Sequence, residues 1–218
     1  MTLTPESTDA SRYTEIGSAE ELRELLGAPM RRAIDKERVT LHEWNREWLA
    51  LSPFCLISTS DAAGNCDVSP KGDPPGFIRV LDDTTIAIPD RPGNRRADGF
   101  LNVLENPHVG LISLVPGRGE TLRINGRARL LRDAPFFDDM VVRGHRPALA
   151  LVVEIEQIFF HCAKALMRSK LWRPDTWTPD ALPSHARIVK DLQYTAESLE
   201  ELERYYTPEQ YAQNLYKK

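Results

Sequence analysis

The stretch "HVGLISLVPGRGETLRINGRARLL", residues 108–131, decides the fold class, because it combines two strand-like segments with a tight turn between them. "HVGLISLV" has the composition of a strand, and "TLRINGRARLLR" alternates over the length of a second, longer strand. The intervening "PGRGE" carries proline and two glycines, which are typical of turns. The stretch therefore predicts antiparallel pairing.

Similar patterns lie on both sides of this stretch. "FCLISTS" and "CDVSP" flank the turn "DAAGN", "GFIRVL" and "TTIAIPD" flank a "DD" turn, and "ALALVVEIEQIFFHC" is the last long strand. "RRADGFLNVLENP" predicts a helix that starts near Arg95 and faces inward with Phe100, Leu101 and Leu104. "DAPFFDDMVV" predicts a short helix capped by Asp133. About six antiparallel strands result.

Helices are predicted at both ends of the chain. "SAEELRELLG" begins with a capping-box pattern, Ser18 and Glu21, and "SLEELERYY" begins with another, Ser198 and Glu201. The predicted fold is mainly β (α+β), a small closed or half-closed antiparallel β-barrel with flanking helices. We expect one structural domain overall: an N-terminal tail with helices (1–52), the barrel (53–175) and a C-terminal helical extension (176–218).

Composition excludes several classes of protein. The chain has 218 residues, 41% of them hydrophobic, and a net charge of −4, which predicts no general attraction to nucleic acid or to an anionic membrane. No apolar run reaches the length of a membrane span, and "MTLTPESTDASRYTEIG" lacks the regions of a signal peptide. Cys55, Cys66 and Cys162 are odd in number and have no metal-like spacing, so we interpret them as small apolar residues of a cytoplasmic protein.

Common catalytic motifs are missing from the sequence. There is no P-loop, no dinucleotide-binding glycine motif, no H-E-x-x-H, no G-x-S-x-G and no zinc-type cysteine and histidine cluster. We therefore predict no metal site. His161, at the end of an apolar strand, is open to two interpretations, a half-buried structural histidine or a ligand or acid–base group.

Three basic clusters remain, each at a strand end or turn: "DVSPKGDPPGF", "IAIPDRPGNRRADGF" and "GETLRINGRA". In the third, Thr121 and Arg123 lie on one face of a strand, because side chains alternate with period two. Guanidinium groups, an ammonium group and turn amides from separate segments are suited to a phosphate. Solvated turn charges balanced by neighbouring aspartates are the alternative.

The clusters also carry a family resemblance. The motifs "SPKGD", "IPDRPGN-R", "NP-VGL", "PG-GETLR-NG-A" and "SKLW", in this order, resemble those of the pyridoxamine 5'-phosphate oxidase-like flavoproteins, most of all their mycobacterial-type subfamily. The similarity covers roughly residues 50–175. It implies an FMN-binding split β-barrel that forms a homodimer, with the flavin at the subunit interface.

The resemblance also implies roles for particular residues. It places Ser69 and Lys71 near the flavin ring or ribityl chain, and Thr121 and Arg123 on a strand that touches the flavin and approaches the substrate. The residues expected at the phosphate are Asp90, Arg91, Asn94, Arg95 and Arg96, with Arg95 preferred. Those expected to close the site, from either subunit, are Ser169, Lys170 and Trp172.

The chain departs from the oxidase proper in two places. It has a longer loop rich in proline, glycine and asparagine instead of the compact Ser-Arg-Lys-Gly motif, and "RSKLW" instead of the C-terminal arginine signature. The resemblance therefore implies the flavin more directly than it implies pyridoxamine phosphate as the substrate.

The leading hypothesis is an FMN-dependent oxidoreductase acting on a small-molecule substrate, with Lys71 and Arg123 as the candidate catalytic residues. The alternatives are a flavin carrier or sensor without turnover, and a split barrel that uses a deazaflavin (F420) or haem, for which His161 would be the candidate ligand.

Overall fold

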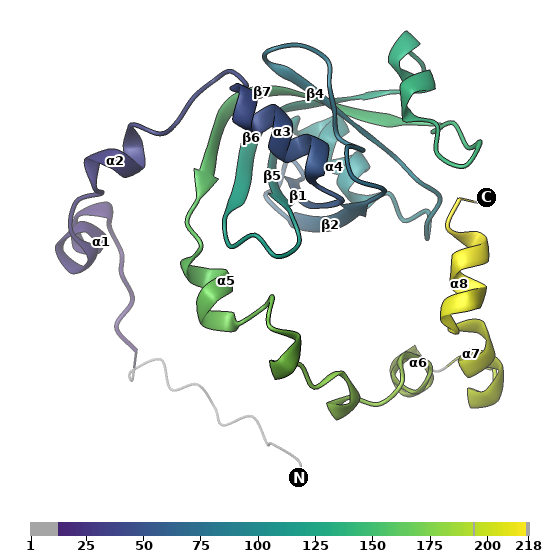
Figure 1. Ribbon diagram of the computed structural model, residues 1–218. Coiled ribbons are helices and arrows are strands. Elements are labelled where there is room, and N and C mark those ends of the chain that lie inside the picture. Colours follow the sequence, from purple (N-terminus) through teal and green to yellow (C-terminus); the bar gives the residue numbers. More distant parts are fainter. Residues whose placement is uncertain (1–12, 194, 217–218) are drawn as a thin grey trace. The chain divides into compact units, whose positions relative to one another are not determined.

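The computed structural model describes residues 13–193 and 195–216 (Figure 1). By its internal contacts the chain divides into two units, Met1–Lys36 and Glu37–Lys218. The first unit contains α1 (Ala19–Leu26) and α2 (Arg31–Ile34). The predicted cap of α1 is confirmed, because the Ser18 side chain accepts a hydrogen bond from the Glu21 amide. Residues 1–12, part of the segment considered for a signal peptide, lie outside the described residues.

The second unit is built on a seven-stranded sheet in the order β2-β1-β5-β6-β7-β4-β3. All neighbouring strands are antiparallel, which confirms the predicted fold class, and each of the seven segments quoted above as a strand forms one, against the total of about six that was expected. The strands are β1 (Phe54–Ser60), β2 (Cys66–Gly72), β3 (Arg79–Val80), β4 (Thr85–Pro89), β5 (His108–Leu114), β6 (Thr121–Leu131) and β7 (Ala150–His161).

The predicted hairpin of residues 108–131 forms the β5–β6 pair, in which Val109 lies opposite Gly126. Between β6 and β7 the register shifts at Asn125/Gly126. At Gly126 a Cβ atom would lie 2.0 Å from the carbonyl oxygen of Glu154, so only glycine permits this close approach of two strands.

The core of the sheet is filled by aliphatic side chains that alternate along the strands. Leu122 and Ile124 of β6 and Ile158 of β7 are fully buried. Helix α3 (Glu43–Leu51) closes one side with Trp48, whose ring meets Phe160 edge-on at 5.3 Å and whose indole N–H donates to Ser113. This paired indole satisfies a polar group that would be costly to bury alone.

Helix α4 (Asp98–Glu105) packs against β1, β2 and β6; the predicted inward position of Phe100 is confirmed, whereas the predicted start and the inward positions of Leu101 and Leu104 were wrong. It begins at Asp98, three residues after Arg95. Its buried residue is Val103, with Phe100 half-buried, whereas Leu101 and Leu104 are 55% and 72% exposed. Its sheet-facing side runs through residues 99, 100 and 103 instead, because the orientation of a short helix is set by the strands it packs against.

The segment after β6 and the C-terminal part consist of short helices. They are η2 (Pro135–Met140), α5 (Lys164–Ser169), η3 (Pro174–Thr176), η4 (Pro179–Ala181), α6 (His185–Gln193), α7 (Leu199–Tyr205) and α8 (Pro208–Asn214). The capping box of Ser198 and Glu201 on α7 is confirmed. The predicted cap of η2 by Asp133 was wrong, because this carboxylate pairs with Arg146 instead. Among the described residues, no helix has the length and apolarity needed to cross a bilayer.

Candidate functional site

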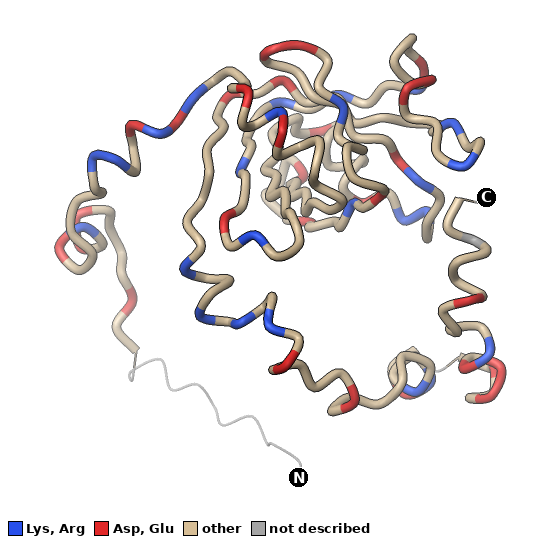
Figure 2. The backbone as a smooth tube through the Cα atoms, in the orientation of Figure 1, with Lys and Arg blue, Asp and Glu red and all other residues tan. Residues whose placement is uncertain are grey.

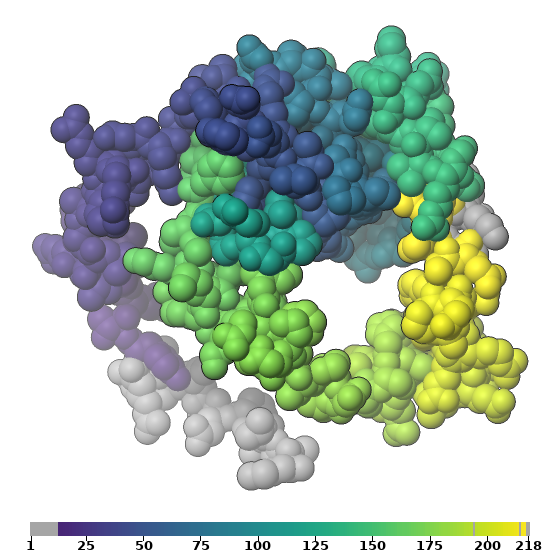
Figure 3. Space-filling view, viewed as in Figure 1, coloured from purple at the N-terminus to yellow at the C-terminus, as the bar shows by residue number. Residues whose placement is uncertain are grey.

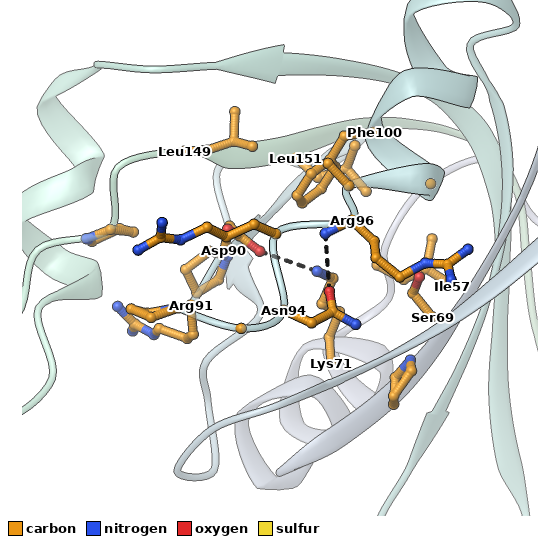
Figure 4. A pocket seen from close by; sticks show the side chains of 18 of the residues that line it. Ile57, Ser69, Lys71, Asp90, Arg91, Asn94, Arg96, Phe100, Leu149 and Leu151 are labelled. Atoms are coloured by element: carbon orange, nitrogen blue, oxygen red, sulfur yellow. Dashed lines mark hydrogen bonds and ion pairs between the residues drawn. The ribbon is translucent and has the colours of Figure 1, made fainter. Parts of the chain in front are cut away.

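One large cavity opens beside β2 and the loop that joins β4 to α4. Its volume is about 1370 Å³, and its walls come from β2, this loop, the start of α4, residues 145–151 and Tyr216. Seven residues predicted from the sequence line it together: Ser69, Lys71, Asp90, Arg91, Asn94, Arg95 and Arg96 (Figure 4). Figure 2 shows the basic residues of the loop, in blue, close to one another.

Strand β2 presents one side to the cavity because its residues alternate between half-buried and exposed. Asp67, Ser69 and Lys71 share the half-buried side. The Ser69 hydroxyl donates to Asp67 at 2.8 Å, and the Lys71 ammonium lies 3.1 Å from a carboxylate oxygen of Asp90. The same ammonium lies 4.5 Å from the ring centroid of Phe100. A cation is thereby fixed at an aromatic wall of the cavity.

The loop of residues 90–97 holds an unusual backbone conformation. Arg95 and Ala97 have φ angles of 62° and 60°, in the left-handed region that favours glycine. Between them, the amide of Arg96 donates to the Asn94 side chain at 3.0 Å (Figure 4). Each such residue costs on the order of 1 kcal/mol or more, and such strain concentrates at functional sites.

The three arginines of the loop differ in their partners. Arg91 is 13% exposed and paired with Asp73, whose side chain is 1% exposed. Arg96 pairs with Asp98 at 2.7 Å. Arg95 makes no ion pair or hydrogen bond with any residue that the structure describes. Arg95 is therefore the arginine whose donors are available to an anion in the cavity.

A cysteine nucleophile is excluded at this site. Cys55 lies opposite Lys71 in the β1–β2 pair and is fully buried. Burial raises the pKa of its thiol to about 12, and the nearby charge of Lys71 offsets this only in part. The thiol stays neutral at physiological pH and packs as a small apolar group.

The other predicted residues gather elsewhere, around the turn between β5 and β6. Thr121 pairs with His161 across β6 and β7, and the Arg123 guanidinium lies 5.1 Å from the Phe159 ring centroid. The Trp172 indole donates to the carbonyl oxygen of Arg118 at 2.7 Å. None of the five residues of this group lines the cavity of the chain: Thr121, Arg123, Ser169, Lys170 and Trp172.

Comparison with known proteins places this architecture. The model of the family "Pyridoxamine 5'-phosphate oxidase" matches residues 41–162, more than half of the chain. The chain belongs to the pyridoxamine 5'-phosphate oxidase family. No match was found among curated protein sequences. The mycobacterial-type subfamily stays a prediction.

Several solved structures are similar to this chain at low sequence identity. HupZ of Group A Streptococcus is 17% identical over 55% of this chain and 93% of its own, with a TM-score of 0.45. A candidate pyridoxamine 5'-phosphate oxidase of Lactobacillus delbrueckii is 21% identical over 56% and 95%, with a TM-score of 0.44. An F420 reductase is 16% identical over 54% and 98%, with a TM-score of 0.39.

The family match contains the cavity-lining residues of β2 and the loop, together with Thr121 and Arg123. "RSKLW" and the C-terminal helices lie beyond it.

Sequence reasoning missed three residues at the cavity. Asp67 could have been found, because it has the same strand parity as Ser69 and Lys71. His145 and Tyr216 carried no signal, since only the folded chain brings them to the loop.

Proposed function

We propose that this chain is an FMN-dependent oxidoreductase whose phosphate-binding loop is residues 90–97. The observation that carries the proposal is Arg95, whose guanidinium lies in a strained loop lining the cavity and has no ion pair or hydrogen bond among the described residues. Guanidinium groups bind phosphate through two parallel hydrogen bonds, and turn amides add further donors. The turn of Asn94 and Arg96 supports the same role.

The cavity also fits the remainder of FMN. Its volume of about 1370 Å³ exceeds the 300–1,000 Å³ that is typical of small-molecule sites, which leaves room for a substrate beside the cofactor. Ile57, Phe100 and Leu151 provide apolar walls suited to an aromatic ring system (Figure 4). Ser69 and Asp67 offer polar contacts to a ribityl chain.

FMN supplies the electron and hydride chemistry when it is bound. Lys71 then places a positive charge beside the ring, where it stabilises negative charge, and Asp90 holds the ammonium in position. Asp90 thus orients Lys71 in this proposal. We keep Lys71 and Arg123 as the candidate catalytic residues.

The separation of the two residue groups supports a homodimer. Thr121, Arg123 and Trp172 lie outside the cavity of their own chain, so a site that uses both groups needs a second copy. In this proposal the partner contributes its β5–β6 end and "SKLW" segment to the flavin, which then lies at the subunit interface. His161, the candidate haem ligand, belongs to the same separate group and would also reach the cavity only from the partner subunit.

A visible spectrum of the purified protein tests the proposal. We expect flavin absorption that survives gel filtration, release of FMN on acid precipitation, and a dimer by sedimentation. Titration of the ligand-free protein with FMN, F420 and haem ranks the three cofactors. A protein that takes up F420 or haem but not FMN contradicts the proposal. If FMN binds but is not reduced and reoxidised with any electron donor and acceptor tried, the alternative of a flavin carrier is favoured.

A further inference from the structure

A buried carboxylate at the end of β2 connects the phosphate-binding loop to the C-terminus. The side chain of Asp73 is 1% exposed and has two partners. One oxygen accepts from Nε of Arg91 at 2.5 Å, and the other accepts from the hydroxyl of Tyr216 at 2.5 Å. A buried carboxylate needs such partners, because loss of one leaves part of its charge unsatisfied.

Arg91 uses its donors within the chain. Besides Asp73, its guanidinium donates to the carbonyl oxygens of Met140, at 2.7 Å, and His145, at 3.4 Å. This arginine therefore fixes the beginning of the loop to two other segments. The same contacts remove it from the set of arginines that are free to hold a phosphate.

Tyr216 approaches this arginine from the segment after α8, 143 residues along the chain from Asp73. Its ring centroid lies 5.7 Å from the Arg91 guanidinium, 5.6 Å from that of Arg143 and 6.0 Å from the His145 ring. Figure 3 shows the yellow C-terminal segment against the green segment that follows β6.

The phenol is suited to a permanent donor role. Burial, and then its hydrogen bond to Asp73, raise the pKa of Tyr216 above its ordinary value, so the hydroxyl keeps its proton at neutral pH. Tyr216 lies beyond the residues that match the family model. Its contact with the loop is therefore a property of this chain's own C-terminal extension.

We propose that Tyr216, Asp73 and Arg91 form a positioning network through which the C-terminal segment holds the phosphate-binding loop in its ligand-ready conformation. The inference rests on the proposed function for the identity of the ligand. Tyr216 is a positioning residue, because it acts on the phosphate through Arg91 and the loop.

Contacts along the loop connect the network to Arg95. Asp90 is held by Lys71 and by a backbone bond from its amide to the Leu149 carbonyl oxygen, and Arg91 is held by the network. Arg95, four residues later, has no partner of its own among the described residues. Its position therefore depends on the anchored residues before it. Removing the Tyr216 hydroxyl takes away one of the two partners of the Asp73 carboxylate, which weakens the hold of Asp73 on Arg91 and, through Arg91, the anchor of the loop.

The test uses the full-length chain with Tyr216→Phe, which keeps the ring and removes only the hydroxyl. Tyr211→Phe is the matched control, since this tyrosine of α8 is 49% exposed and does not line the cavity. Tyr216→Phe loses the hydrogen bond to the charged Asp73, which should destabilise the ligand-ready conformation of the loop. We therefore expect this variant to bind FMN about tenfold more weakly. Riboflavin, which lacks the phosphate, should bind both variants as it binds the wild type.

Two further measurements separate a positioning role from a general structural one. In an Arg95→Ala background, Tyr216→Phe should have no additional effect on FMN affinity, because the group positioned by the loop is already absent. Without any ligand, hydrogen exchange at the bonded amides of Asp90, Arg96 and His145 should accelerate in Tyr216→Phe but not in Tyr211→Phe.

The outcomes distinguish this inference from the proposed function. If the wild type binds no FMN, the proposed function fails, and the exchange experiment still decides whether the network holds the loop. Unchanged exchange at the three amides overturns the inference. So does an equal loss of FMN and riboflavin affinity, or an equal effect of the two phenylalanine variants.

Discussion

Replacing Arg95 by alanine removes a guanidinium of the proposed phosphate-binding loop that has no ion pair or hydrogen bond among the described residues, and little else. The side chain makes no ion pair or hydrogen bond within the described residues, so no protein contact is lost with it. Alanine also has a Cβ atom, so a φ angle of 62° strains the backbone of the variant as much as that of the wild type. We therefore expect the free energy of unfolding to change by less than about 0.5 kcal/mol.

The expected effect on ligand binding is large by comparison. A hydrogen bond to a charged group contributes about 1.5–3 kcal/mol, and the exposed rim position of Arg95 favours the lower half of this range. About 2 kcal/mol corresponds to a roughly thirtyfold increase in the dissociation constant of FMN. The loss of FMN affinity in Arg95→Ala should decrease as salt is added, because salt screens the attraction between the guanidinium and the phosphate in the wild type.

Fluorescence titration of the ligand-free protein measures this effect. Arg132→Ala is the matched control, since it removes the same charge from an exposed residue outside the cavity. Riboflavin is the control ligand and should bind Arg95→Ala and the wild type equally. If Arg95→Ala and Arg132→Ala weaken FMN equally, or if Arg95→Ala weakens riboflavin as much as FMN, the phosphate assignment is refuted.

Three further predictions concern the sheet and the cavity wall. Gly126→Ala should lower the free energy of unfolding in urea by about 1–3 kcal/mol, because a Cβ atom would lie 2.0 Å from a carbonyl oxygen of β7. At pH 8 iodoacetamide should label the exposed Cys66 and Cys162 but not Cys55 in the native protein. Burial raises the pKa of Cys55 from 9.0 to about 12 in the folded protein, so the neutral thiol contributes its full share to stability below pH 9. Between pH 9 and about pH 12 the free energy of unfolding should fall by up to about 1.4 kcal/mol per pH unit. Cys55→Ala should remove this part of the pH dependence. Lys71→Met should lower the two-electron midpoint potential of the bound flavin by about 30 mV, if the lost charge stabilises the reduced form by about 1.4 kcal/mol. Spectroelectrochemistry measures this shift, and an unchanged potential would contradict an electrostatic role for Lys71.

Strand pairing was predictable from the sequence because its signals are local. The turns "DAAGN" and "PGRGE" join segments of adjacent sequence, and both pairs formed in the structure. The buried face of α4 was not predictable in the same way. Leu101 and Leu104 are apolar but exposed, because the orientation of a short helix depends on the strands it packs against, here β1, β2 and β6.

The candidate site shows the same division between local and long-range information. Strand parity and the basic loop brought Ser69, Lys71 and the arginines to one cavity. The sequence analysis preferred Arg95 but gave no reason to exclude Arg91, because the partners of Arg91 come from remote segments that only the fold brings together. Proximity along the chain therefore identified the loop, whereas tertiary contacts assign different roles to its arginines.

The positions of glycine in the loop help to explain why residue 95 is an arginine. Gly93 does not have a positive φ, whereas Arg95 and Ala97, which do, are not glycine. If the loop were only a solvated connection, glycine at position 95 would relieve a strain on the order of 1 kcal/mol. A guanidinium that is unpartnered at such a position gains nothing from the protein in return. A ligand that uses this guanidinium would account for an arginine at this position, and this supports the proposed anion binding over the alternative of solvated turn charges.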